Sequence, residues 1–175
     1  MRMTPLRLFH LLVLVACIFL AGCPASAPSA GRPALRPIDA SGLARLLDQH
    51  RGQVVLVDFW ATWCGPCVKL FPHTVELERR FHDRGLVVIT VSLDDPADGE
   101  PARKFLDRSG AVTENYLSSY GVGPEAMTAF GIADGALPHV RIYDAEGRLR
   151  KTFASGGRMV DPKEIESVVE ELLGH

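Results

Sequence analysis

The sequence predicts an α/β fold in which a β-α-β half is followed by a β-β-α half. In the first half, two almost uninterrupted apolar and β-branched runs, Val54–Trp60 and 86–93, flank a stretch with helical spacing. In the second half, two strand-like runs joined by a turn precede a well-marked terminal helix. Strands that are apolar along their whole length are typical of a sheet that is covered on both faces.

The first half of the predicted fold opens with a short helix. Leu43, Leu46 and Leu47 have helical spacing, and Gly52 marks the end of this helix. We expect the next elements in this order: a strand over 54–60, a helix over about 66–83, and a strand over 86–93.

The second half has a clear end and an unclear beginning. We expect its elements in this order: a helix over 101–108 that stops at Gly110, short helical turns and loop over 114–132, strands over 138–144 and 148–153, and a last helix. That last helix carries strong start signals, because Asp161 can cap it, Pro162 suits its first position and Glu164 can complete a capping box.

The N-terminal residues have the pattern of an export signal. Arg2 and Arg7 supply a positive region, and the apolar run 8–20 is too short to span a bilayer. The following Leu20-Ala21-Gly22-Cys23 resembles a bacterial lipobox, in which cleavage precedes a cysteine that receives lipid. The alternative is an ordinary secretory peptide cut after residue 27, which would leave a proline as the new N-terminus.

These signals divide the chain into three parts. We expect a lipoprotein signal peptide over 1–22, a flexible tether over 23–37 that is rich in Pro, Ala, Ser and Gly, and a folded domain over 38–175. The whole chain has 19 basic and 21 acidic residues, and its formal net charge is −2. Without the signal peptide, 17 basic residues would face 21 acidic ones, and no basic block would support nucleic-acid binding.

The motif Trp63-Cys64-Gly65-Pro66-Cys67 is the strongest chemical signal in the chain. It follows a predicted strand and opens a predicted helix, so the first thiol would lie at a helix N-terminus, where the helix dipole favours a thiolate. Two thiols at this spacing can close into a disulfide and reopen. A structural zinc site would need four ligands, and the sequence has no second Cys-x-x-Cys pair. The other two cysteines, Cys17 and Cys23, belong to the leader and the lipid site.

Together with the preceding Asp-Phe-Trp-Ala, this motif resembles thioredoxin. The resemblance covers about residues 36–173 and implies the thioredoxin fold, with a central mixed β-sheet flanked by helices. The lipobox, the Phe-Trp-Ala-Thr-Trp-Cys wording and the additional residues between Leu93 and Pro138 are similar to the membrane-anchored, extracytoplasmic thiol-disulfide oxidoreductases of the TlpA/ResA kind. We therefore expect an exported, lipid-anchored enzyme facing the periplasm or the cell exterior, active as a monomer without a cofactor or metal.

Three residues are expected to carry the chemistry. Cys64 is the expected nucleophile, and Cys67, one turn into the helix and more buried, the expected resolving thiol. Asp58 interrupts an apolar strand, so burial should raise its pKa toward neutrality. Thioredoxin has a buried aspartate at the matching position, which implies proton transfer with the second cysteine. The alternative is a solvent-facing aspartate at a strand end. Thr90 stands where the resemblance leads us to expect a lysine partner.

The resemblance also points to a substrate-binding surface. Pro138 matches the cis-proline that faces the cysteine pair in this fold, and Leu137 precedes it. Trp63 is expected to form an apolar lip beside the first cysteine, with Gly65 and Pro66 exposed between the thiols. His139 could tune substrate choice, although we expect a strand residue without a role in proton transfer.

The direction of electron flow is predicted from the two residues between the cysteines. Gly65 and Pro66 offer neither charge nor a side-chain donor to a thiolate, which favours a reductase. The family then implies a transmembrane thiol reductase as electron donor, and oxidised cysteines of apocytochrome c or of copper-site proteins as acceptors. A disulfide oxidase or isomerase would share these residues. A non-catalytic thioredoxin-like lipoprotein for docking or metal handover is the other alternative.

Overall fold

The computed structural model describes residues 34–154 and 159–174 of the chain. The elements follow in the order β1 (Leu35–Ile38), α1 (Ala40–Gln49), β2 (Val54–Trp60), α2 (Gly65–Phe81), a 3-10 helix (His82–Arg84), β3 (Leu86–Ser92), α3 (Glu100–Ser109), β4 (Glu114–Ser118), α4 (Pro124–Ala129), β5 (His139–Tyr143), β6 (Leu149–Ala154) and α5 (Pro162–Leu172). Each strand expected from an apolar run is present, with bounds within one residue of the prediction.

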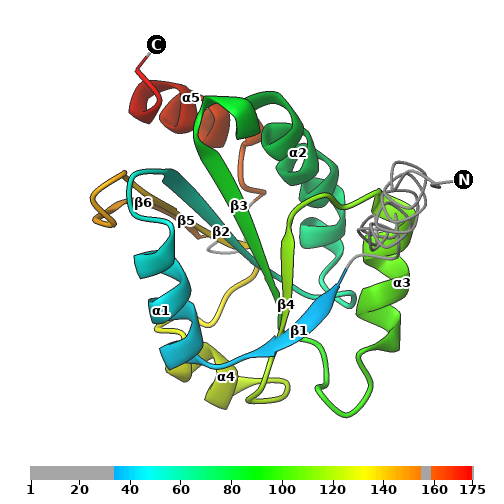
Figure 1. Cartoon of the computed structure of the whole chain (residues 1–175). Helices are drawn as coiled ribbons and strands as arrows, with labels where there is room; N and C mark the ends of the chain where they lie inside the picture. The colour runs from blue at the N-terminus through cyan, green and yellow to red at the C-terminus, as the bar shows by residue number, and fades with distance from the viewer. Residues whose placement is uncertain (1–33, 155–158, 175) are drawn as a thin grey trace, which may run out of the picture. The chain divides into compact units, whose positions relative to one another are not determined.

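The six described strands form one mixed sheet in the order β1-β4-β3-β2-β5-β6 (Figure 1). β1, β4, β3 and β2 run parallel to one another, whereas β5 is antiparallel to both β2 and β6. β2 therefore lies at the change of direction, with β3 on one side and β5 on the other. The predicted thioredoxin-like fold, a central mixed sheet flanked by helices, is confirmed.

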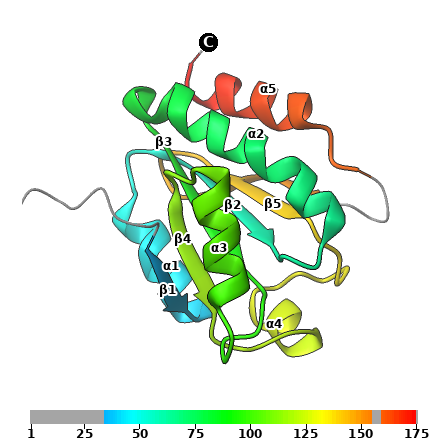
Figure 2. The same ribbon diagram turned by 90° about the vertical axis from the view of Figure 1, so that its right-hand side faces the viewer.

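Helices cover both faces of this sheet (Figure 2). Alternate residues of β2 and β3 pack against α1 and α4 on one face, in a cluster that includes Val57, Ile89 and Leu43. The intervening residues, such as Leu56 and Val88, pack against α2 and α5 on the other face. α3 joins α2 on this second face. The two central strands are buried along their whole length, which explains why they lack a polar alternation.

The expected start of the last helix is also present. Asp161 is the N-cap of α5, and its carboxylate accepts a hydrogen bond of 2.9 Å from the backbone N–H of Lys163. Pro162 is in the first turn, where its missing N–H leaves no hydrogen bond unmade. Asp39 caps α1 in the same way through the N–H of Gly42.

The prediction for residues 114–132 is wrong at its beginning. Instead of helical turns, residues 114–118 form β4, which lies between β1 and β3. Asn115 and Ser118 are buried in this strand. The amide of Asn115 donates to the carbonyl of Thr113 and accepts from the hydroxyl of Thr90. Because these polar groups are satisfied by partners inside the fold, the strand has no apolar run that the sequence could reveal.

The expected boundary between tether and domain is also wrong by a few residues. The expected tether includes residues 35–37, but they form β1 together with Ile38 and pair with β4 in parallel. Arg36 and Pro37 are exposed at the edge of the sheet, where a proline is tolerated. The signal peptide, Cys23 and most of the expected tether lie outside the described residues.

Candidate active site

The two cysteines of the motif lie where β2 ends and α2 begins. Cys64 is the N-cap of α2, and its sulfur accepts a 3.2 Å hydrogen bond from the backbone N–H of Cys67. The two sulfurs are bonded to each other as a disulfide. Cys64 is 6% exposed and Cys67 1%. The expected order of exposure is therefore present, although Cys64 is more covered than a helix end would indicate, because it packs with Trp60 and Ala61.

The residues around the pair form an open rim. Gly65 and Pro66 are exposed in the first turn of α2, and a Cβ on Gly65 would have no heavy atom within 4 Å. Trp63 is 56% exposed. It borders a groove of about 450 Å³ whose other wall comes from α4 and the loop after it, including Met127 and Ile132. The expected apolar lip is thus exposed and lies along a groove.

The segment before β5 approaches the same end of β2. The Leu137–Pro138 peptide bond is cis, as predicted. Leu137 is partly buried and packs against the cluster that contains both cysteines. Because β5 pairs with β2, with His139 opposite Phe59, this pairing fixes the proline beside the end of the strand that leads to Cys64.

Asp58 lies on the face of β2 that is turned to α2. It is 1% exposed, and its Oδ2 accepts a hydrogen bond of 2.8 Å from the hydroxyl of Thr74 on α2. Its Oδ1 is buried without a hydrogen-bond partner among the described residues. Burial raises the pKa of Asp58 to about 6, and the hydrogen bond from Thr74 opposes this rise. The alternative of a solvent-facing aspartate is wrong.

Thr74 is a site residue that the sequence reasoning missed. Thr90, the residue opposite Asp58 in β3, gives its hydroxyl to Asn115 instead of to Asp58. The partner of Asp58 comes from the helix, seven residues after Cys67 and so on the same face of α2. The available signal was a threonine at a core-facing position of that helix.

A second missed residue, Asp94, holds the turn that leads to the cysteines. It is 5% exposed, and it accepts hydrogen bonds from the backbone N–H and the hydroxyl of Thr62 and from the hydroxyl of Ser92. Trp60 and Ser92 pair in register, and Thr62 and Asp94 each follow this pair by two residues. Adjacent parallel strands that end together bring such residues to one edge, so the common offset was a usable signal.

His139 is a buried strand residue beside the proline, at 4% exposure. Its Nε2 accepts a 3.1 Å hydrogen bond from Nε of Arg141. Burial lowers the pKa of His139, the charge of Arg141 lowers it further, and Asp134, at 3.8 Å from Nδ1, opposes both. The imidazole is therefore held neutral near pH 7.

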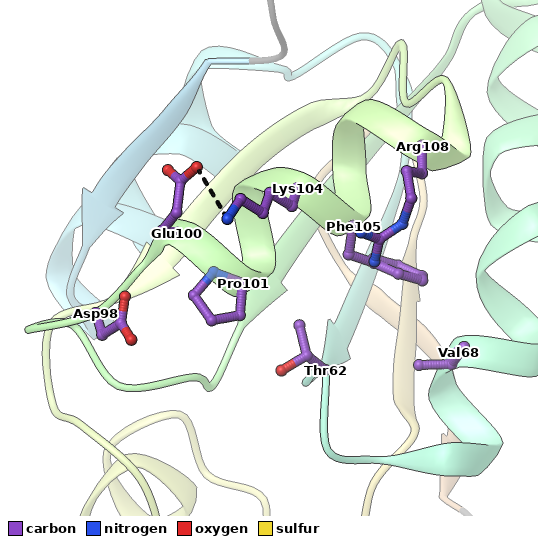
Figure 3. A pocket seen from close by; sticks show the side chains of 8 residues that line it. All are labelled: Thr62, Val68, Asp98, Glu100, Pro101, Lys104, Phe105 and Arg108. Atoms are coloured by element: carbon purple, nitrogen blue, oxygen red, sulfur yellow. Dashed lines mark ion pairs between the residues drawn. The ribbon is translucent and has the colours of Figure 1, made fainter.

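A larger hollow of about 600 Å³ lies on the α3 side of the turn (Figure 3). Thr62 and Val68 face α3 across it, and Lys104 pairs with Glu100 at 3.9 Å on its far wall. The described residues contain no group of three or more His, Cys, Asp or Glu side chains that could hold a metal ion. Within the same residues, no helix has the length and apolar character needed to cross a membrane.

Comparison with known proteins identifies the family. The profile described as Redoxin matches residues 33–169, which is most of the chain. The chain belongs to the Redoxin family. This Redoxin-family chain is 28% identical over 138 residues to the thiol-disulfide oxidoreductase ResA of Geobacillus thermodenitrificans, covering 74% of the chain and 71% of the relative.

Solved structures support the same assignment of this Redoxin-family chain. A Chlorobium tepidum structure, provisionally named thiol:disulfide interchange protein DsbE, has a TM-score of 0.57 and 28% identity, covering 73% of this chain and 85% of that one. Another thioredoxin-family thiol:disulfide interchange protein from Chlorobium tepidum has a TM-score of 0.58 at 21% identity, covering 82% and 99%, and shows the fold alone. The predicted resemblance to the TlpA/ResA kind and the predicted enzyme class, a thiol-disulfide oxidoreductase, are confirmed.

Proposed function

We propose that this oxidoreductase reduces disulfides of exported proteins through a dithiol–disulfide cycle of Cys64 and Cys67. The observation that carries the proposal is the bonded pair at the N-terminus of α2, with Cys64 as the N-cap residue. An N-cap sulfur accepts a backbone N–H and lies at the positive end of the helix dipole, and both effects favour its thiolate.

The cycle begins with the reduced pair. The Cys64 thiolate attacks one sulfur of a substrate disulfide, forms a mixed disulfide and expels the other substrate sulfur as a thiolate. Cys67 then loses its proton and attacks Cys64, which releases the reduced substrate and closes the pair. Asp58 is the proposed acceptor of the Cys67 proton, because its carboxyl is buried on the α2 side of β2 and its pKa is about 6.

The reducing direction rests on what lies between the cysteines. Gly65 and Pro66 are exposed and bring no charge or side-chain donor to the Cys64 sulfur. A thiolate that is not strongly stabilised makes the dithiol form less stable, and the pair then gives up its electrons more readily. Equilibration with glutathione buffers tests this step. A potential as high as that of a strong oxidant would indicate the oxidase or isomerase alternative.

The proposed substrate surface surrounds the pair. Trp63, Leu137 and Pro138 come from two segments that meet at the end of β2, and the groove beside Trp63 continues along α4. An extended substrate segment could run past the proline while an apolar side chain next to the substrate cysteine enters this groove.

The proposed cellular setting comes from residues outside the described part of the chain. We infer a signal peptide over 1–22, a lipid on Cys23 and a tether that ends at β1. An extracytoplasmic reductase needs electrons from inside the cell, so a transmembrane thiol reductase is the proposed donor. Cys23→Ser should abolish acyl labelling and leave the protein unprocessed or mislocalised. Normal processing with unchanged membrane association would contradict the anchor.

Two measurements test the activity and name the substrate. The wild-type protein should reduce insulin disulfides. Cys67→Ser should trap substrates as mixed disulfides, because no second thiol remains to release them, whereas Cys64→Ser should trap few. Identifying the trapped proteins would separate cytochrome c or copper-site maturation from a general role. Equal trapping by both variants would contradict the assigned roles. Absent reduction and trapping, together with stoichiometric metal binding, would indicate the non-catalytic alternative.

A further inference from the structure

Thr74 and Asp58 form a buried pair, of which the proposed cycle gives a role only to Asp58. The two side chains are 2% and 1% exposed, and the Thr74 hydroxyl donates to Oδ2 of Asp58 at 2.8 Å. A threonine hydroxyl has one proton to donate, so it can hold only one of the two carboxyl oxygens. The other oxygen, Oδ1, is buried and has no hydrogen-bond partner in the described part of the chain.

The remaining neighbours of Asp58 do not compete for Oδ1. In the sheet, Asp58 lies between Thr90 of β3 and Val140 of β5. The first gives its hydroxyl to Asn115, and the second is apolar. On the buried face of α2, the ionisable residues are Cys67 and Glu78. Glu78 accepts the backbone N–H of Val88 at 2.8 Å and is thereby held one turn beyond Thr74.

We propose that Thr74 is a positioning residue for proton transfer between Cys67 and Asp58, because its hydroxyl holds Oδ2 and leaves Oδ1 as the oxygen that receives the proton. This inference rests on the proposed function. Cys67 and Thr74 lie two turns apart on one face of α2, so the same helix that carries the resolving thiol also orients its base.

The step is balanced within the site. In the mixed disulfide, the proton of the Cys67 thiol passes to Oδ1 of Asp58, and the Cys67 thiolate attacks the sulfur of Cys64. The new S–S bond forms as the bond from Cys64 to the substrate breaks. The substrate sulfur leaves as a thiolate with the bonding electron pair, and the protein pair is left oxidised.

The hydroxyl of Thr74 also determines the pH at which this base is available. Its hydrogen bond stabilises the ionised carboxylate and opposes the rise in pKa that burial causes. Thr74→Val removes the hydroxyl at nearly constant volume, so the pKa of Asp58 should rise further. Release of the substrate from the mixed disulfide requires ionised Asp58, so the release rate declines at low pH. In Thr74→Val this decline, the acid limb of the pH–rate profile, should therefore move to higher pH.

The experiment compares three variants in a single-turnover release assay across pH 5 to 9. The wild-type acid limb should lie near pH 6. In Thr74→Val it should move up by about one pH unit, which corresponds to an about tenfold slower release on the acid side. Thr74→Ser keeps the hydroxyl and should restore the wild-type limb. Thr90→Val is the matched control, because it removes a buried hydroxyl beside Asp58 that is bonded elsewhere. Its limb should not move.

A second readout is independent of turnover. The carboxyl carbon of Asp58, followed by ¹³C NMR, should titrate about one unit higher in Thr74→Val than in the wild type. Thr74→Ala serves the same purpose if the valine disturbs folding. An unchanged Asp58 titration in a folded variant without the hydroxyl overturns the inference, as does an equal shift in Thr90→Val. If the wild type reduces no disulfide at any pH, the proposed function fails, whereas the titration still decides the Thr74–Asp58 pairing.

Discussion

Asp58 in β2 and Asp144 in the turn after β5 are both nearly inaccessible to solvent, at 1% and 5% exposure. The two carboxyls differ in how many hydrogen bonds they accept and in the direction in which their pKa is shifted. Asp58 accepts one side-chain hydrogen bond, from the hydroxyl of Thr74. Asp144 accepts from two backbone N–H groups, those of Glu146 and Arg148, and from the side chains of Arg148 and Arg150. Burial alone would raise the pKa of both carboxyls. It raises that of Asp58 to about 6, whereas the donors around Asp144 lower its pKa to about 2.

The difference separates a carboxyl that can exchange a proton from one that holds a structure. A carboxylate that accepts several hydrogen bonds stays ionised at every physiological pH, so it fixes the β5–β6 turn and cannot act as an acid or base there. A carboxyl with one donor and one free oxygen changes its protonation state near neutral pH. The supply of donors, more than burial, therefore distinguishes the two roles.

The largest expected effect tests the proton-exchanging member of the comparison. Asp58→Asn should slow release of the mixed disulfide by about 10²-fold or more at pH 8, because it removes the base at nearly equal volume. Asp144→Asn is the matched control and should keep the wild-type rate. Stopped-flow kinetics would measure both. Unaltered rates of Asp58→Asn between pH 6 and 9 would reduce Asp58 to a structural residue.

The second effect is on stability. The pKa of Asp58 is about 6 in the folded state against 3.8 for an exposed carboxyl, so the folded state retains the proton longer. Its contribution to stability is therefore complete below pH 3.8 and is lost as the pH rises through 6. Relative to Asp58→Asn, the wild-type free energy of unfolding should fall by about 2 kcal/mol between pH 4 and pH 8. Urea titrations at both pH values measure this change, and a constant difference would contradict it.

The third effect has the opposite sign in pH and belongs to Asp144. Asp144→Asn should lower the melting temperature at pH 7, because backbone and arginine donors lose their charged acceptor. The stabilisation by Asp144 is present above the unfolded pKa of 3.8 and is lost as the pH falls toward 2. The gap in melting temperature between variant and wild type should therefore narrow from pH 7 to pH 2. A gap that widens on acidification would break the comparison.

The smallest effect concerns Asp94, a donor-rich carboxyl beside the active turn. Its carboxylate accepts several hydrogen bonds, from Thr62 and Ser92. In this respect it is more similar to Asp144 than to Asp58. Asp94→Asn should lower kcat/KM for insulin reduction about tenfold or less, because it weakens the hydrogen bonds that orient the turn without removing a reacting group. A loss of activity as large as that of Asp58→Asn would show that the position of a carboxyl near the cysteines matters more than the number of hydrogen-bond donors around it.

Features that depend on residues close together in the sequence were predicted, whereas features that depend on residues distant in the sequence were missed. The Cys64–Cys67 pair and the raised pKa of Asp58 were predictable, because a short motif and an acid inside an apolar strand carry their own signals. β4 was missed, because Asn115 is satisfied by Thr90, which is distant in the sequence. Thr74 was missed for the same reason. The roles of Cys64, Cys67 and Asp58 remain predictions that the variants above test, and the role of Pro138 in substrate binding remains a prediction.

The strand at the start of the domain was missed because of its place in the sheet. β1 is an edge strand, and its exposed Arg36 and Pro37 have the composition of a linker. Only Ile38 is buried among its four residues, so one face contributes a single apolar signal. Whether an edge strand of this length forms depends on its pairing with a neighbouring strand, here β4, more than on its own hydrophobicity.

The same edges bear on self-association. The described sheet ends in β1 on one side and β6 on the other. Pro37 lacks an N–H to offer along the first edge, and Arg36 adds a cation there. The second edge carries Arg150 and Lys151, both exposed. Proline and like charges on open strands oppose the addition of another sheet. These edge residues therefore oppose edge-to-edge pairing of this sheet with the sheet of another copy.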